Sequence, residues 1–237
     1  MTGNALGIFA KEPLSGRVKT RLCPPLTYDQ AALLYRTALE ETVAAMAAAP
    51  AELVLFFDGD PAFFQENFPH LKLVPQGPGD LGARLDTAFR HLFAGGYRSA
   101  AMIGSDSPDL PLPLVAEAFA ALRGDDLAVI PARDGGYVFI GERTHQPELF
   151  RDIPWSTCEV WPATRRTATR LGLQCRILDT WDDLDDQAGL TRLIRRSPAS
   201  LTARLASRLL SHHRVPVISQ GKVVDLPRAI TDNQPEL

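Results

Sequence analysis

Short apolar runs alternate along the chain with longer segments in which apolar residues recur every three or four positions. The runs have the length of β-strands and occupy residues 5–11, 52–57, 71–75, 100–103, 127–131, 137–141 and 176–178. Segments with helical spacing follow at residues 27–43, 83–93, 157–171 and 187–196, with one more opened by the proline at 111 or 113. This alternation predicts an α/β fold with a mainly parallel sheet and helices on both faces.

The C-terminal part of the chain follows a different pattern. Residues 201–213 form a basic amphipathic segment that predicts a helix, whereas residues 214–237 contain three prolines and little periodicity. We therefore expect a domain over residues 1–196, followed by a helical extension and tail over residues 197–237. The tail is expected either to pack on the domain or to be partly disordered. The basic residues of the extension suit a solvated helix face or contact with a membrane or partner; they are Arg204, Arg208, His212 and His213.

Composition narrows the classes of protein that need to be considered. The 237 residues include 45% hydrophobic and 22% charged residues, which is ordinary for a globular protein with a buried core. The formal net charge of −3 argues against a general nucleic-acid binder. Three widely spaced cysteines form neither a zinc pattern nor a disulfide framework, which suits a reducing compartment. Without a signal peptide or a run long enough to span a membrane, we expect a cytoplasmic protein.

A basic loop directly follows the first apolar run. It carries four cations, Lys11, Arg17, Lys19 and Arg21, around Gly16. At the end of a strand, such cations can donate charge-assisted hydrogen bonds to phosphate oxygens, and glycine permits a close approach of the backbone. The loop does not match the P-loop pattern, and a solvated surface turn accounts for it equally well. Both interpretations are open from this loop alone.

Carboxylates follow two later apolar runs. Asp106 comes directly after residues 100–103, where a strand would hold it rigidly in a position suited to Mg²⁺ or Mn²⁺. Its alternative role is to cap the following helix, a role that we assign to Asp109. A metal ion needs a second protein carboxylate, which Asp185, or Asp183 in its place, can supply, although negative charge also favours a helix start. Because ligands of open α/β sheets bind beyond the carboxyl ends of strands, these segments indicate a metal-dependent nucleotide site.

Two glycine-containing segments give weaker indications. Asp134, Gly135 and Gly136 predict a tight turn between strands, and the two missing side chains would also let a sugar or base approach the backbone. Gly82 opens similar space ahead of Arg84, which either reaches an anion or lies on a helix surface. No histidine falls in a catalytic or metal-binding pattern and no nucleophile elbow is present, so hydrolysis by a serine triad is unsupported.

The order of these segments resembles that of a known family. FAKEP begins at residue 9, GRVKTRL at 16, GDLG at 79, IGSDSPDL at 103, PARDGGY at 131 and DLD at 183. Together they resemble a bacterial family of GT-A-type glycosyltransferase-like proteins, some of them associated with arsenosugar biosynthesis. The resemblance extends from about residue 5 to residue 195. It implies the nucleotide-diphospho-sugar transferase superfamily and a Rossmann-like, three-layer α/β/α GT-A fold.

The resemblance also implies a reaction and its participants. The leading function is metal-dependent transfer of a sugar from a nucleotide-diphosphate sugar to a small acceptor, with Asp106 and Asp185 as ligands of Mg²⁺ or Mn²⁺. The family is similar to small guanylyltransferases as well, so transfer of a nucleotide from an NTP to a phosphorylated small molecule is the alternative. Lys19 and Arg21 suit a pyrophosphate cradle and, with Asp106, are the expected catalytic residues. A non-catalytic nucleotide-binding module is the third hypothesis.

Overall fold

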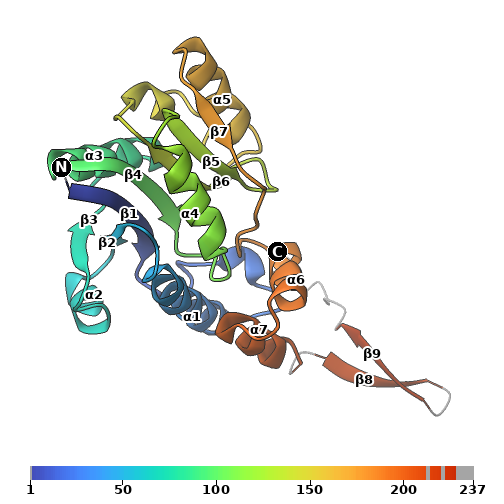
Figure 1. Ribbon diagram of the computed structural model, residues 1–237. Helices are drawn as coiled ribbons and strands as arrows, with labels where there is room; N and C mark the ends of the chain where they lie inside the picture. Colours follow the sequence, from blue (N-terminus) through green and yellow to red (C-terminus); the bar gives the residue numbers. More distant parts are fainter. Residues whose placement is uncertain (1, 212–213, 220–221, 228–237) are drawn as a thin grey trace, which may run out of the picture.

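A mainly parallel sheet forms the centre of the molecule, as the sequence predicted. The computed structural model describes residues 2–211, 214–219 and 222–227. Within these residues the sheet has seven strands in the order β3-β2-β1-β4-β6-β5-β7 (Figure 1). Their bounds are β1 (Thr2–Lys11), β2 (Glu52–Asp58), β3 (Lys72–Pro75), β4 (Tyr97–Gly104), β5 (Leu127–Pro131), β6 (Tyr137–Glu142) and β7 (Cys175–Ile177). Only β6 runs antiparallel to its neighbours in this sheet.

Helices cover both faces of the sheet and complete the expected three layers. The described helices are α1 (Tyr28–Met46), α2 (Pro61–Asn67), α3 (Leu81–Ala94), α4 (Leu112–Ala121), α5 (Val160–Arg170), α6 (Gln187–Arg196) and α7 (Leu201–Ser211), with short 3-10 turns η1 (Thr20–Leu22) and η2 (Pro147–Phe150). Of these, α6 and α7 pack in a cluster with α1 and not on the sheet. Helix α2 was not predicted, because its short apolar segment spans only two turns. It begins after Asp60, whose carboxylate accepts a hydrogen bond from the backbone N–H of Ala62.

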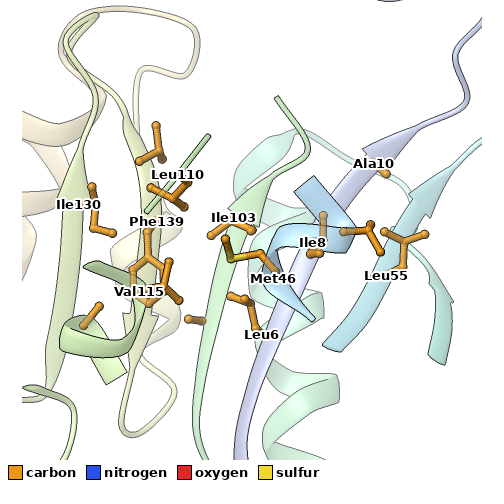
Figure 2. Close-up of a cluster of buried hydrophobic side chains, with 14 of the residues drawn as sticks. Leu6, Ile8, Ala10, Met46, Leu55, Ile103, Leu110, Val115, Ile130 and Phe139 are labelled. Atoms are coloured by element: carbon orange, nitrogen blue, oxygen red, sulfur yellow. The ribbon is translucent and has the colours of Figure 1, made fainter. Parts of the chain in front are cut away.

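Alternate side chains of the central strands enter two separate cores. On one face, Leu6 and Ile8 of β1 pack with Met46 of α1 and Val115 of α4 (Figure 2). On the other face, the buried residues of the strands pack against α3, α5 and η2. This division follows from the two-residue period of a strand, which points successive side chains to opposite faces.

The first long helix begins where the sequence predicted. The Thr27 side chain accepts a hydrogen bond of 3.2 Å from the backbone N–H of Gln30, whose side chain accepts one of 2.9 Å from the Thr27 N–H. This reciprocal capping box satisfies two donors at the start of α1. Helix α1 therefore begins shortly after the basic loop, and the loop lies at the carboxyl end of β1.

Helix α7 packs on α1 and α6. Its first turn is held by Glu41 of α1, whose carboxylate accepts backbone hydrogen bonds of 2.8 Å from Leu201 and 2.9 Å from Thr202. The predicted helix included His212 and His213, which lie outside the described residues. Two short strands follow, β8 (Arg214–Ser219) and β9 (Lys222–Pro227), and form an antiparallel hairpin that the low periodicity of this segment did not predict. Within the described part of the chain, no helix has both the length and the apolar character needed to cross a bilayer.

Candidate active site

A cavity of about 560 Å³ lies where β1 and β4 end. The strand order places β2 on one side of β1 and β4 on the other, and the crevice at such a reversal is the usual ligand site of an open α/β sheet. Six of the residues singled out from the sequence line this cavity: Lys11, Arg17, Lys19, Arg84, Asp106 and Asp185. The basic loop and the acidic segments therefore meet at one site.

The backbone of the basic loop folds around a small apolar anchor. Val18 is buried against Ala32 and Tyr35 of α1. Gly16 and Lys19 on either side of this anchor have positive φ angles of 73° and 49°, which turn the chain sharply in both places. A lysine in the left-handed region is uncommon, and the surrounding packing must hold it there. The loop thus directs Val18 inward and leaves its cations at the cavity.

Two cations of the loop are available for a ligand. The side chains of Lys11 and Arg17 are exposed at the cavity and make no hydrogen bond or ion pair with any described residue. Both also line a smaller hollow of about 340 Å³ that adjoins Asp58. Unpaired cations at a strand end favour the phosphate-binding interpretation of the loop over the surface turn.

The other two cations are paired with the acidic segments. Lys19 Nζ lies 2.7 Å from Asp106 Oδ2 and 3.5 Å from Asp185 Oδ1, and only 7% of its side chain is exposed. Burial disfavours the charge on Lys19, but the nearby carboxylates outweigh it, so the pKa of the ammonium lies above its ordinary value. Arg21 Nη1 lies 2.5 Å from Asp185 Oδ2 on the more exposed side. Arg21 does not line the cavity itself.

The two acidic segments are joined to each other by backbone contacts. The N–H of Leu184 donates a 2.8 Å hydrogen bond to the carbonyl of Asp106, and the hydroxyl of Ser107 lies 3.4 Å from the carbonyl of Asp182. Burial and the charge of Asp106 raise the pKa of Asp183 to about 7, with Asp134 and Asp185 adding to the effect. Asp183 therefore holds a proton more readily than an ordinary carboxyl, because it is buried close to the other carboxylates of the site.

Asp109 has a structural role different from the predicted one. Helix α4 has Pro111 at its N-cap and no side-chain cap, so the assignment of Asp109 as the capping residue is wrong. Its carboxylate instead accepts hydrogen bonds of 2.7 and 2.9 Å from Arg196 and 2.6 Å from Ser197, while Arg196 also lies 2.6 Å from Asp182. This ion-pair network ties the segment after β4 to the end of α6, far away in the sequence.

Beside Arg84, which the sequence singled out, the cavity is lined by two polar residues that sequence reasoning missed, Asp58 and Gln76. Arg84 Nη1 lies 2.7 Å from Asp58 Oδ2 and 3.2 Å from Gln76 Oε1. The buried amide of Gln76 also donates to the carbonyls of Ala10 and Phe56, at 3.1 and 3.0 Å. Arg84 is thus both a residue of α3 and part of the cavity. Asp58 ends β2, so the same strand-end argument that selected Asp106 would have selected it.

Tyr35 connects the basic and acidic sides of the site. Its buried hydroxyl accepts a 2.8 Å hydrogen bond from the backbone N–H of Lys11 and lies 2.7 Å from the hydroxyl of Ser105. The carbonyl of Ser105 is 3.5 Å from the hydroxyl of Thr42. Helix α1 therefore fixes the ends of β1 and β4 relative to each other. No local motif marks Tyr35, whose apolar neighbours identified it only as a core residue.

Five of the proposed binding residues do not line the cavity: Arg21, Gly82, Asp134, Gly135 and Gly136. The idea that missing side chains leave room for a ligand is wrong at two of them. A Cβ at Gly82 would collide with the Phe150 carbonyl, and one at Gly135 with the backbone of Cys158. Asp134 accepts a 2.9 Å hydrogen bond from the Gly136 N–H, which supports the tight-turn interpretation.

The acidic segments fit a metal ion that is completed by substrate. Asp106 and Asp185 both approach one nitrogen, that of Lys19, so one cation placed there reaches both carboxylates. The described residues contain no group of three His, Cys, Asp or Glu side chains arranged to hold an ion. Two carboxylates, with waters and phosphate oxygens in the other positions, are the usual surroundings of Mg²⁺ in nucleotide sites.

Comparison with known proteins agrees with this architecture. Residues 39–157 match a family described as an uncharacterized protein conserved in bacteria (DUF2064). A Desulfovibrio desulfuricans G20 protein, provisionally named a nucleotide-diphospho-sugar transferase, is 32% identical, with 88% of this chain and 97% of that chain covered and a TM-score of 0.83. None of the curated proteins matches this chain.

More distant structures share the fold alone. A nucleotidyl transferase from Methanothermobacter is 14% identical, with a TM-score of 0.54 over 89% of this chain and 98% of its own. CMP:2-keto-3-deoxy-manno-octonic acid synthetase, solved with CTP, is 12% identical, with a TM-score of 0.53 over 84% of this chain and 100% of its own. The chain therefore belongs to the bacterial DUF2064 family and has the fold of the nucleotide-diphospho-sugar transferases.

Proposed function

We propose that this protein is a transferase for a nucleotide-activated substrate, and specifically a metal-dependent glycosyltransferase that uses a nucleotide-diphosphate sugar and a small acceptor. The observation that carries this proposal is the meeting of Lys11 and Arg17, which have no partner among the described residues, with Asp106 and Asp185 in one cavity. Its volume of about 560 Å³ lies in the range of small-molecule sites. The name of the Desulfovibrio relative supports the same class of donor.

The residues of the cavity would have separate roles in such a reaction. Asp106 and Asp185 would hold Mg²⁺ or Mn²⁺, which supplies positive charge to the departing diphosphate when bound. Lys11 and Arg17 bind and orient the diphosphate. As the acceptor oxygen attacks the anomeric carbon, the bond from that carbon to the diphosphate oxygen breaks and its electron pair stays on the leaving group. Lys19, which lines the cavity, stabilises the charge that develops there, whereas Arg21 lies outside the cavity lining.

Nucleotidyl transfer is the second candidate, and the pairing of Lys19 supports it. Here a substrate phosphate attacks the α-phosphorus of an NTP and pyrophosphate departs. The Lys19 ammonium lies against Asp106 on the cavity side, a position that suits departing pyrophosphate. One of the distant structures with this fold is named a nucleotidyl transferase, and another was solved with CTP, which gives the alternative a precedent on the same scaffold.

Thermal shift with matched ligands tests the proposal. A ligand that binds only the native state raises the melting temperature. With Mg²⁺ or Mn²⁺ present, we expect a nucleotide-diphosphate sugar to raise it more than the corresponding nucleoside triphosphate does. Arg17→Gln should reduce this shift, whereas Arg170→Gln, at an exposed arginine of α5 outside the cavity, should not.

The other outcomes separate the hypotheses. A larger shift with the triphosphate would favour nucleotidyl transfer. Binding of a nucleotide sugar without release of nucleoside diphosphate in the presence of candidate acceptors would favour a non-catalytic module. No shift with either class of ligand would contradict the proposal of a nucleotide site.

A further inference from the structure

A buried lysine occupies the place between the two carboxylates assigned to the metal. Lys19 Nζ lies 2.7 Å from Asp106 Oδ2 and 3.5 Å from Asp185 Oδ1. Its side chain is 7% exposed, compared with 29% for Asp106 and 38% for Asp185. Arg21 carries the same charge but lies 66% exposed and contacts only Asp185. Among the described residues, Lys19 alone places its charged group within ion-pair distance of both Asp106 and Asp185.

This arrangement has an electrostatic reason. Asp106 and Asp185 come from distant segments that the hydrogen bond between Leu184 and Asp106 brings together. Both carboxylates lie within 3.5 Å of the same nitrogen atom, and at this proximity they repel each other unless a cation lies between them. In the chain alone, the ammonium of Lys19 supplies that cation. A divalent ion bound by both carboxylates needs the same oxygen atoms, so the ion and the ammonium compete for them.

If a metal ion takes over the two carboxylates, the cavity around Lys19 offers its ammonium a different anionic partner. Lys19 lines the cavity on the same loop as Arg17, whose guanidinium is unpaired within the described residues. A nucleotide bound there presents phosphate oxygens to this loop. Four rotatable carbon bonds let a lysine exchange one anionic partner for another without movement of the backbone.

We propose that Lys19 is an internal counterion that exchanges with the metal: metal binding to Asp106 and Asp185 releases the ammonium, which then pairs with a phosphate of the bound nucleotide. This inference rests on the proposed function, because the exchange needs a nucleotide in the cavity. Metal alone must displace the ammonium into water, whereas metal and nucleotide together give it a new partner. The two ligands therefore bind with positive cooperativity, which by linkage is equal in both directions.

Titration calorimetry with Mn²⁺ on the full chain tests the exchange. Lys19→Met removes the competitor, so we expect Mn²⁺ alone to bind at least about tenfold more tightly than to wild type. Arg21→Gln is the matched control, because it removes one positive charge near Asp185 without vacating the position between the carboxylates. We expect its Mn²⁺ affinity to rise by less than about threefold. The cooperativity between Mn²⁺ and nucleotide should disappear in Lys19→Met and persist in Arg21→Gln.

The exchange would be overturned if Lys19→Met bound Mn²⁺ no more tightly than wild type. It would also be overturned if Arg21→Gln gained as much Mn²⁺ affinity as Lys19→Met. Lys19→Gln, which keeps a hydrogen-bond donor for Asp106, gives the same comparison if Lys19→Met fails to fold. Absence of nucleotide binding in the wild type refutes the proposed function and leaves the Mn²⁺ comparison intact. The two failures are therefore distinguishable.

Discussion

The backbone N–H of Leu184 donates a 2.8 Å hydrogen bond to the carbonyl oxygen of Asp106, although α4, β5, β6, α5 and β7 lie between them in the sequence. Because this contact is made by the main chain, it does not depend on the charge of the neighbouring carboxylates. The acidic segments are thus brought together by the fold, and the side chains of Asp106 and Asp185 can change partner without separating the segments.

Replacement of Asp109 should lower stability clearly. Its side chain is 6% exposed and receives hydrogen bonds from Arg196 and Ser197. We expect Asp109→Asn to lower the free energy of unfolding by about 2–3 kcal/mol in urea denaturation, because Arg196 loses a buried charged partner but keeps Asp182. Glu40→Gln breaks the exposed pair with Arg36 and should cost less than about 0.5 kcal/mol. Equal losses in the two variants would contradict a structural role for the Asp109 network.

Removal of the Tyr35 hydroxyl should weaken both the fold and the site. The hydroxyl joins the Lys11 N–H to the Ser105 hydroxyl, so Tyr35→Phe leaves a buried donor without its partner. We expect unfolding free energy to fall by about 1–2 kcal/mol and nucleotide affinity to fall by about threefold to tenfold. Tyr28→Phe changes an exposed tyrosine of the same helix and should alter neither quantity. Unchanged nucleotide affinity in Tyr35→Phe would show that the bridge does not position the basic loop.

Alanine at Gly135 should destabilise the protein through close packing as well as backbone strain. Gly135 has φ of 94°, and an added Cβ would meet the backbone of Cys158. We expect Gly135→Ala to cost about 2–4 kcal/mol in denaturant unfolding. Gly172 has a φ of 69° but open space around it, so Gly172→Ala should cost only about 1 kcal/mol. Similar losses of unfolding free energy in the two variants would mean that the backbone at Cys158 can shift to accommodate the added Cβ.

Stability should fall as the pH rises through neutrality. Glu142 is fully buried, its Oε1 has no partner in the described structure, and its Oε2 lies 3.0 Å from His145 Nδ1. Burial raises the pKa of Glu142 from an ordinary 4.5 to about 7. Although burial opposes its charge, the carboxylates of Glu142 and Asp86 raise the pKa of His145 above its ordinary value. Both shifts mean that the folded state binds more protons than the unfolded state.

Proton linkage gives the direction in which the unfolding free energy changes with pH. Stability supplied by these protons is complete below the unfolded pKa values and is lost as the pH rises through the folded ones. We expect the unfolding free energy to fall by about 2–3 kcal/mol between pH 5 and pH 8 from this cluster. Glu142→Gln should flatten the profile, whereas Glu66→Gln, at an exposed carboxylate, should leave it as in the wild type. A wild-type profile that rises over this interval would contradict the assignment.

Most of the sheet and helices followed from local patterns in the sequence. The apolar runs correspond to strands because a buried strand needs little more than a short apolar segment, and Thr27 marked the start of α1 through its capping chemistry. The strand-end rule also selected Lys11 and Asp106 correctly as cavity residues. These inferences succeeded because each depends on a few neighbouring residues.

Other parts depend on contacts between distant segments and leave no local signal. Asp109 looks like a helix cap until α6 brings Arg196 to it. Gly135 looks like an opening for a ligand until the chain returns at Cys158 to fill the space. Tyr35 is one apolar-face residue among many, and only the meeting of β1 and β4 gives its hydroxyl a role. The pairing of Lys19 with two carboxylates was beyond sequence reasoning for the same reason.

Helix α1 contacts the candidate site through Tyr35 and the C-terminal helix through Glu41, two turns further on. A chain cut back to residue 196 would lose the partners of Glu41 and remove Ala203 and Ala206 from the apolar cluster shared with α1. The damage would fall on the same helix that holds β1 and β4 in position. Shortening this protein from its C-terminal side is therefore a perturbation of the ligand cavity, transmitted through α1.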